Sequence, residues 1–186
     1  MGSIILTGPK HSGKTCAGRA LAQICSSDFF DLDDLIFQRT GKTPRQLFCI
    51  NPDVFKEAET EAMSALVEEN CDSVIAAGGG IIDNSEAITL LKKNNWIKVY
   101  LNISAGSAWN RIVKTSGFSA ANAESAIALL PPFLQTENPQ ETHRTLHERR
   151  AAAYLQFADI LIEAEGKTPE EIAMEISVQL PSGFLT

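Results

Sequence analysis

The stretch that decides the fold is IILTGPKHSGKT, residues 4–15. An apolar run is followed by the pattern G-x-x-x-x-G-K-T, with glycines at Gly8 and Gly13 and with Lys14 and Thr15 at its end. The two glycines let the backbone curl until successive N–H groups point at phosphate oxygens, and a following helix adds the positive end of its dipole. The lysine can bridge two phosphates, and the threonine hydroxyl can hold Mg²⁺. The stretch therefore predicts a loop that binds a nucleoside triphosphate with Mg²⁺.

Two neighbours complete the predicted nucleotide site. Ser12 lies inside the loop and Cys16 at the start of the expected helix, and both are predicted to contact ATP. Lys10 and His11 stand at loop positions where side chains vary, so no catalytic role is predicted for them. Lys14 is predicted to be catalytic because its charge can stabilise the transferring phosphoryl group.

Short apolar runs alternate with helical patterns along the rest of the chain. The patterns predict strands at 3–7, 29–31, 73–77, 96–103 and 159–162, and helices at 14–25, 54–68, 85–93, 105–114, 141–157 and 168–178. Strands separated by helices indicate a parallel sheet covered on both faces. We therefore expect one domain over residues 1–186, of the α/β class, with a five-stranded parallel sheet in an α/β/α sandwich and a lid segment at about 115–140.

Composition and charge exclude several classes of protein. The 186 residues carry 16 Lys and Arg against 23 Asp and Glu, a net charge of −7, which argues against a protein that coats nucleic acid. No apolar run reaches the length of a membrane span, and the first ten residues lack the pattern of a signal peptide, so a cytoplasmic location is expected. The four cysteines form no CxxC pair and are predicted to be reduced and mostly buried rather than zinc ligands. A monomer is the default expectation.

Carboxylates follow the second predicted strand, at the edge of the sheet where ligands bind. One carboxylate of Asp31 and Asp33 can anchor the waters of Mg²⁺, and the other can orient a substrate hydroxyl and accept its proton. The alternative is helix capping, with Asp33 or Asp34 as the N-cap of a helix that begins near Leu35. Function is favoured for Asp31 and Asp33, and capping for Asp34. The triplet Gly78–Gly80 ends the third strand and permits close approach of a ligand to the backbone.

These motifs resemble the shikimate kinase family, small P-loop kinases of the nucleoside monophosphate kinase fold. The resemblance covers nearly the whole chain and rests on the loop at 8–15, Asp-x-Asp at 31–33, Phe55-Lys56-x-x-Glu59, the glycine triplet, Glu148-Arg149-Arg150 with Tyr154, and Ala158-Asp159. It implies transfer of the ATP γ-phosphate to the 3-hydroxyl of shikimate, with Mg²⁺, in aromatic amino-acid biosynthesis.

The resemblance also implies roles for individual residues on the acceptor side. It matches Asp31 to Mg²⁺ and Asp33 to the shikimate hydroxyls, where Asp33 would be catalytic. Gly78–Gly80 would form part of the pocket for the acid. Arg150, four residues before Tyr154, would bind the carboxylate of shikimate, together with Lys56.

On the nucleotide side the resemblance implies that Lys114 and Pro169 hold the adenine. The family also carries an arginine before Pro-Leu in the lid, which reaches over the ATP phosphates. The comparable stretch here, at 131–134, reads PPFL, and no Lys or Arg occurs between Lys114 and Arg144. The comparison with the family predicts a lid longer than usual, with an inserted helix over 120–130.

Two departures from the family pattern leave alternatives open. Lys56 replaces an arginine, which keeps the charge but loses the planar two-pronged contact with a carboxylate. Arg111 and Arg144 are the candidates to replace the lid cation. The first hypothesis is a shikimate kinase; the alternatives are a kinase of another hydroxylated acid and a nucleotide-binding regulatory module with weak catalysis. The alternative for Arg149 and Arg150 is that they have no binding role and lie on a solvated helix face beside Glu148.

Overall fold

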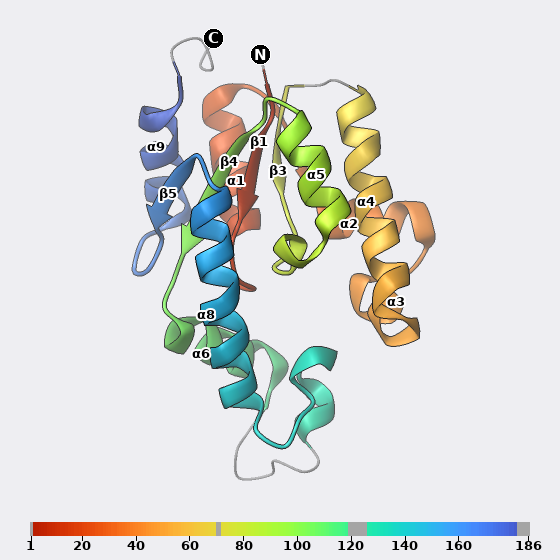
Figure 1. The fold of residues 1–186 in the computed structure, drawn as a ribbon. Helices are drawn as coiled ribbons and strands as arrows, with labels where there is room; N and C mark the ends of the chain where they lie inside the picture. Colours follow the sequence, from red (N-terminus) through yellow and green to blue (C-terminus); the bar gives the residue numbers. More distant parts are fainter. Residues whose placement is uncertain (1, 70–71, 119–125, 182–186) are drawn as a thin grey trace.

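The structure is a computed structural model that describes residues 2–69, 72–118 and 126–181. Its strands form one parallel sheet in the order β2-β3-β1-β4-β5, with β1 in the centre (Figure 1). The strands are β1 (Ile4–Thr7), β2 (Asp28–Asp31), β3 (Ser73–Ala76), β4 (Ile97–Asn102) and β5 (Ile160–Glu163). The predicted α/β class and five-stranded parallel sheet are confirmed, and each predicted strand lies within a residue or two of its observed place.

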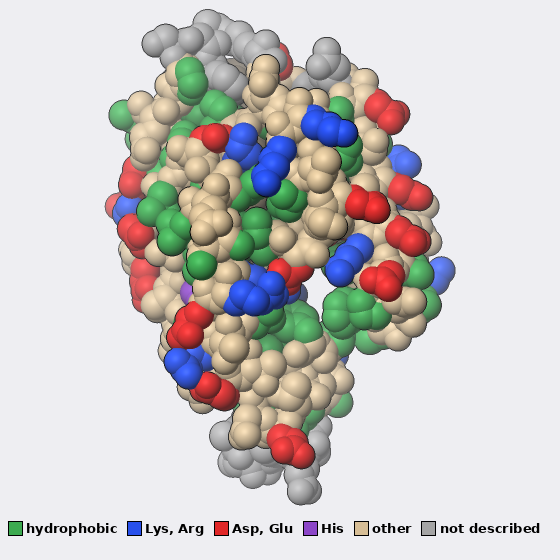
Figure 2. Space-filling view, viewed as in Figure 1, with side chains coloured by type: hydrophobic (Ala, Val, Ile, Leu, Met, Phe, Trp, Pro, Cys, Tyr) green, Lys and Arg blue, Asp and Glu red, His purple; other side chains and the backbone are tan. Residues whose placement is uncertain are grey.

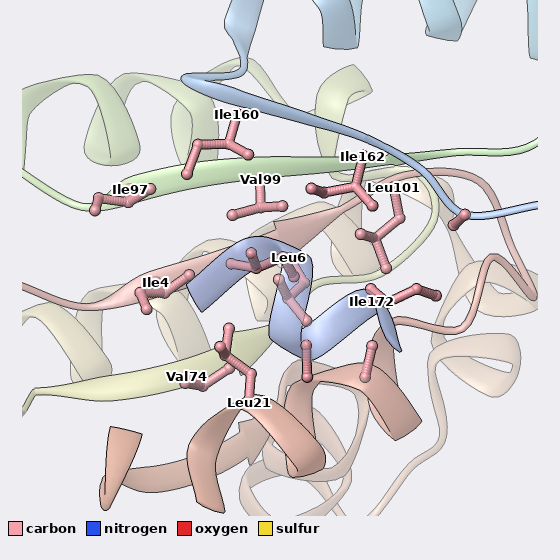
Figure 3. Packing of buried hydrophobic residues seen from close by; sticks show 14 of the residues in the cluster. Ile4, Leu6, Leu21, Val74, Ile97, Val99, Leu101, Ile160, Ile162 and Ile172 are labelled. Carbon is pink, nitrogen blue, oxygen red and sulfur yellow. The ribbon is translucent and has the colours of Figure 1, made fainter. Parts of the chain in front are cut away.

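Side chains of successive strand residues point to opposite faces of the sheet, which is why both faces are apolar. On one face Ile4 and Leu6 pack with residues of α1 (Lys14–Cys25) and α9 (Pro169–Gln179), such as Leu21 and Ile172 (Figure 3). On the other face Ile5 packs in a second buried cluster. That cluster draws on helices α2 (Leu32–Thr40), α4 (Pro52–Glu69), α5 (Ser85–Lys93) and α8 (Pro139–Phe157). The sheet is therefore covered on both sides, as the alternating pattern predicts.

Two helices lie between β2 and α4: α2, which begins three residues before the helix start expected near Leu35, and α3, which was not predicted. Helix α2 begins directly after Asp31, whose side chain accepts a hydrogen bond from the backbone N–H of Asp33. Helix α3 (Pro44–Ile50) begins with a reciprocal capping box between Thr43 and Gln46. Both helices are short, and their starts depend on side-chain caps rather than on a long apolar period.

The segment 126–138 follows α6 (Ala105–Ser116) and leads into α8. It contains two short 3₁₀ helices, η3 (Ile127–Leu129) and η4 (Pro132–Leu134). A third apolar cluster is formed by two buried residues of α6, Trp109 and Ile112, with Leu130 and Leu134 of the segment. Most of the helix predicted over 120–130 lies outside the described residues, and the described end of that range is η3.

The prediction of mostly buried cysteines is wrong for the thiols that the structure describes. Cys16 and Cys49 are exposed on their helices, whereas Cys25 is half-buried and packs against the cluster that contains Leu21. Cys71 lies outside the described residues. Within the described ranges, none of the helices combines the length and the apolar character that crossing a bilayer requires.

Candidate active site

The loop between β1 and α1 has the backbone that its glycines predict. Gly8 and Gly13 have φ values of +135° and +101°, and His11 also adopts a positive φ of 62°. A Cβ on Gly8 would lie 2.5 Å from the carbonyl oxygen of Leu101, so the position has room only for glycine. Gly13 is the N-cap of α1, and no side chain in the described chain caps that helix. The first N–H groups of α1 are therefore available to an anion.

Lys14 lies inside this loop. Its Nζ donates to the carbonyl oxygens of Gly8 and Pro9, at 3.0 and 2.8 Å, and to Ser12 Oγ at 3.5 Å. Burial lowers the pKa of Lys14 to about 8, although the carboxylates of Asp33 and Asp31 oppose this shift. At neutral pH the buried ammonium is still charged, and a bound phosphate would place a compensating negative charge beside it.

Thr15 and Asp31, the two residues predicted to hold Mg²⁺, are hydrogen-bonded to each other. Thr15 Oγ1 donates to Asp31 Oδ2 at 2.7 Å, while Asp31 Oδ1 accepts from the N–H of Asp33 at 3.0 Å. Asp31 is therefore the N-cap of α2, and the prediction that Asp33 or Asp34 fills that position is wrong. The two roles are compatible because a carboxylate has two oxygens. A hydroxyl and a carboxylate are the hard oxygen donors that Mg²⁺ prefers, so this pair fits the metal.

The glycine triplet after β3 is where the parts of the site converge. A Cβ on Gly79 would lie 2.8 Å from the backbone nitrogen of Lys10, in the phosphate-binding loop. A Cβ on Gly78 would lie 3.1 Å from Glu59 Oε1 and 3.4 Å from Asp33 Oδ1, and one on Gly80 would lie 3.2 Å from a guanidinium nitrogen of Arg150. The nucleotide loop, two carboxyl groups and an arginine all approach this backbone, and the loop lies so close that Gly79 has room only for glycine.

Arg150 is held in place by Asp83 of η1 (Ile81–Asp83). Its Nε and one terminal nitrogen lie 2.9 and 2.8 Å from Asp83 Oδ2, and its other terminal nitrogen donates to the Gly79 carbonyl oxygen at 3.2 Å. Its guanidinium also lies over the Phe133 ring, 5.5 Å from the centroid. Arg149 pairs with Asp83 as well. Arg149 stays exposed, so the interpretation as a solvated face beside Glu148 holds for Arg149 and is wrong for Arg150.

Glu59 is a site residue for which the sequence analysis assigned no role. It is 1% exposed, and its Oε2 accepts from Asn84 Nδ2 at 3.0 Å. Its Oε1 has no hydrogen-bond partner among the described residues. Burial raises the pKa of Glu59 to about 7, against the opposing effect of the Asn84 hydrogen bond. Desolvation and the nearby Asp31 carboxylate also raise the pKa of Asp33. The signal for Glu59 was present in the motif Phe55-Lys56-x-x-Glu59.

Other predicted residues lie farther from this convergence. Lys56 is exposed on α4, one turn before Glu59 and on the same side of the helix. Lys114 is exposed in the last turn of α6, and Pro169 is the first residue of α9. Cys16 is exposed in the first turn of α1. Their contacts with substrate stay predictions.

The two candidates for the lid cation differ in position. Arg111 of α6 donates to the carbonyl oxygen of His11, in the phosphate-binding loop, at 2.8 Å. Arg144 forms ion pairs with Glu141 and Glu148 on an exposed side of α8. Only the first of the two therefore approaches the loop.

A pocket opens between the loop, α8 and the segment 126–138, lined among others by Pro9, Lys10, Phe133 and Arg150. In the space-filling view the surface is hollowed between the upper body of the protein and its lower part (Figure 2). Basic, acidic and hydrophobic side chains all reach the rim of this hollow. The arrangement suits a charged, hydroxylated small molecule next to a nucleotide.

Comparisons with known proteins agree with this geometry. The sequence model described as "Shikimate kinase" matches residues 10–181. The chain is 32% identical to a shikimate kinase of Marinomonas sp. over 94% of this chain and 89% of that protein. It is 33% identical to a shikimate kinase of Thermodesulfovibrio yellowstonii over 95% and 93% of the two chains.

A solved structure is similar over the same range. Shikimate kinase from Acinetobacter baumannii, in complex with shikimate, superposes with a TM-score of 0.79 at 28% identity, covering 96% of this chain and 92% of that one. The chain therefore belongs to the shikimate kinase family, ATP-dependent phosphotransferases that act on an alcohol acceptor.

Proposed function

We propose that this chain transfers the γ-phosphate of ATP to the 3-hydroxyl of shikimate. The observation that carries the proposal is the convergence at Gly78–Gly80. Backbone of the phosphate-binding loop lies next to Gly79, the carboxyl groups of Asp33 and Glu59 lie next to Gly78, and the Arg150 guanidinium lies next to Gly80. A donor phosphate and an acceptor held by these groups would both lie against the same three consecutive glycines, which places the reacting atoms near each other.

The residues of the loop would bind the nucleotide. The N–H groups of the loop and of the first turn of α1 would hold the β- and γ-phosphates, and Lys14 would leave its backbone acceptors for the γ-phosphate. Thr15 and Asp31 would hold Mg²⁺, which supplies charge neutralisation between the phosphates when it is bound.

The acceptor would be bound by charge and by carboxylates. Arg150, already fixed by Asp83, would pair with the carboxylate of shikimate, and Lys56 would add a second positive charge. Asp33 would orient the reacting hydroxyl and accept its proton as the oxygen attacks phosphorus. Its raised pKa suits a group that must take up a proton.

The segment 126–138 would act as the lid. It lies against the pocket through Phe133 and would exclude water, which otherwise competes for the phosphoryl group. Arg111, bound to the loop carbonyl of His11, would supply positive charge near the nucleotide that the lid sequence lacks.

One experiment tests the proposal. ADP formation is measured with ATP and Mg²⁺, with and without shikimate, for the wild type and for Lys14→Ala. Turnover that depends on shikimate and is lost in the variant is the expected result. ATP binding without shikimate-dependent turnover would refute the proposal, and a screen of other hydroxylated acids would then separate another acceptor from a regulatory module.

A further inference from the structure

An arginine outside the predicted site holds the segment 126–138. Arg45 of α3 donates to three successive carbonyl oxygens at the end of η3: those of Ala128 at 2.8 Å, Leu130 at 3.0 Å and Leu129 at 3.4 Å. These bonds join parts of the chain that are 83 to 85 residues apart. A guanidinium suits this task because it presents several donors in one rigid plane.

The position of Arg45 is unfavourable for its own helix. It is the second residue of α3, where the first turn contains no acidic side chain. A positive charge at a helix N-terminus is repelled by the helix dipole. The end of η3 presents carbonyl oxygens with the opposite partial charge, two of which also accept from Gln135 Nε2, and the bonds from Arg45 to them offset the cost within its own helix.

A second contact joins α3 to the same segment. The ring of Phe48, one turn after Arg45, packs edge-on against Phe133 of η4, with centroids 6.4 Å apart. Phe133 in turn lies under the Arg150 guanidinium. Helix α3 is therefore connected through η4 to the arginine that faces the acceptor pocket. Helix α3 is also close to the acceptor side through a second neighbour, because it packs on α4, the helix that carries Glu59 and Lys56.

We propose that Arg45 is a positioning residue for phosphoryl transfer, which latches the segment 126–138 to α3 and so keeps the site closed while both substrates are bound. The inference rests on the proposed function. The segment 126–138 has no Lys or Arg of its own, so the cation in its contact with α3 is supplied by α3, in addition to the apolar packing of Leu130 and Leu134 on α6. Opening the latch would let water reach the γ-phosphate and would loosen Phe133 over the acceptor.

The test compares Arg45→Ala and Arg45→Lys with Arg39→Ala, a control on the exposed last turn of the neighbouring helix α2. For each variant, ADP and phosphorylated acceptor are both quantified, so that ATP lost to water is separated from ATP used in transfer. Because a hydrogen bond to a charged group is worth roughly tenfold or more in an equilibrium constant, we expect the share of ADP formed by hydrolysis to rise about tenfold in Arg45→Ala. Arg45→Lys, which keeps the charge but not the fork, should fall between.

A spectroscopic readout follows the latch directly. Trp109 packs against Leu130 and Leu134 of the segment, whereas Trp96 lies in a different cluster. In a Trp96→Phe background, the emission of Trp109 should shift to the red in Arg45→Ala and stay unchanged in Arg39→Ala.

The outcomes are distinguishable from a failure of the proposed function. Absence of shikimate-dependent turnover in the wild type would refute that function, whereas the Trp109 signal would still report on the latch. If Arg45→Ala formed ADP and phosphorylated acceptor in the same ratio as the wild type, and its Trp109 emission were unchanged, the latch would be overturned. If Arg45→Ala unfolds, Arg45→Lys serves instead, because a lysine ammonium cannot reach all three carbonyl oxygens. A wild-type ratio of ADP to phosphorylated acceptor and wild-type emission in Arg45→Lys would then overturn the latch.

Discussion

Replacing Gly79 by alanine should push the phosphate-binding loop away from the glycine triplet, and so move the nucleotide away from the acceptor. The added Cβ would lie 2.8 Å from the backbone nitrogen of Lys10 and 3.2 Å from its Cα, and the first of these is about 0.6 Å short of ordinary contact at 3.4 Å. Because these atoms belong to the backbone of the phosphate-binding loop, no side chain can turn away. Overpacking of this kind costs about 1–3 kcal/mol, and a displacement on the order of 1 Å costs about a hundredfold in rate.

The assay is steady-state kinetics in ATP and in shikimate, combined with a thermal melt. We expect Gly79→Ala to lower kcat about a hundredfold and to lower Tm by several degrees, roughly 2–4 °C per kcal/mol for a chain of this size. Gly106→Ala is the matched control, because Gly106 lies in the first turn of α6 and a Cβ there meets no atom within 4 Å. Wild-type kcat and Tm in Gly79→Ala would refute the argument that the phosphate-binding loop and the acceptor groups depend on close packing at the glycine triplet.

Three further variants test the remaining groups of the site. Arg150→Lys keeps the charge but cannot reach both Asp83 and the Gly79 carbonyl, so the KM for shikimate should rise at least about tenfold with little change in the KM for ATP; equal rises in both would contradict it. Asp31→Asn should raise the Mg²⁺ concentration needed for half-maximal rate by about 10- to 100-fold, and an unchanged requirement would remove Asp31 from the metal site. Burial raises the pKa of Glu59 from 4.5 to about 7, so the neutral acid is favoured in the folded protein and the stability that this group contributes is lost as pH rises through that interval. Denaturant melts of Glu59→Gln should therefore lose part of the decline in stability between these pH values, up to about 3 kcal/mol, whereas a slope like that of the wild type would show that Glu59 ionises normally.

Much of the fold could be predicted because its signals are local. The loop at 8–15 is defined by glycines that fix backbone geometry, and each apolar strand is bounded by helix patterns within a few residues. Helix α2 was expected to begin near Leu35 and begins at Leu32, whereas α3 was missed although it begins with Thr43, Pro44 and Gln46, a readable start signal. A helix of seven residues has too few turns for its apolar period to stand out.

The partners of the site residues could not be predicted in the same way. Asp83 and Arg150 are 67 residues apart, and Arg45 reaches carbonyls more than 80 residues away. Glu59 looks like an ordinary helix residue in the sequence, and its raised pKa follows from burial in the folded protein, against the opposing hydrogen bond from Asn84. The exposure of Cys16 and Cys49 was misjudged for a related reason, since an average preference for burial does not say which side of a helix faces the core.

The sequence by itself determined the phosphate-binding loop, the parallel sheet and the kinds of charge available to the site, because these depend on residue types at fixed short spacings. Only the tertiary structure decided that the loop, two carboxyl groups and Arg150 meet at three glycines, and that Arg45 ties the segment 126–138 to α3. The physical reason is that distances between remote residues depend on how the layers pack. A side chain's pKa and its hydrogen-bond partners follow from those distances, so they appear only once the chain has folded.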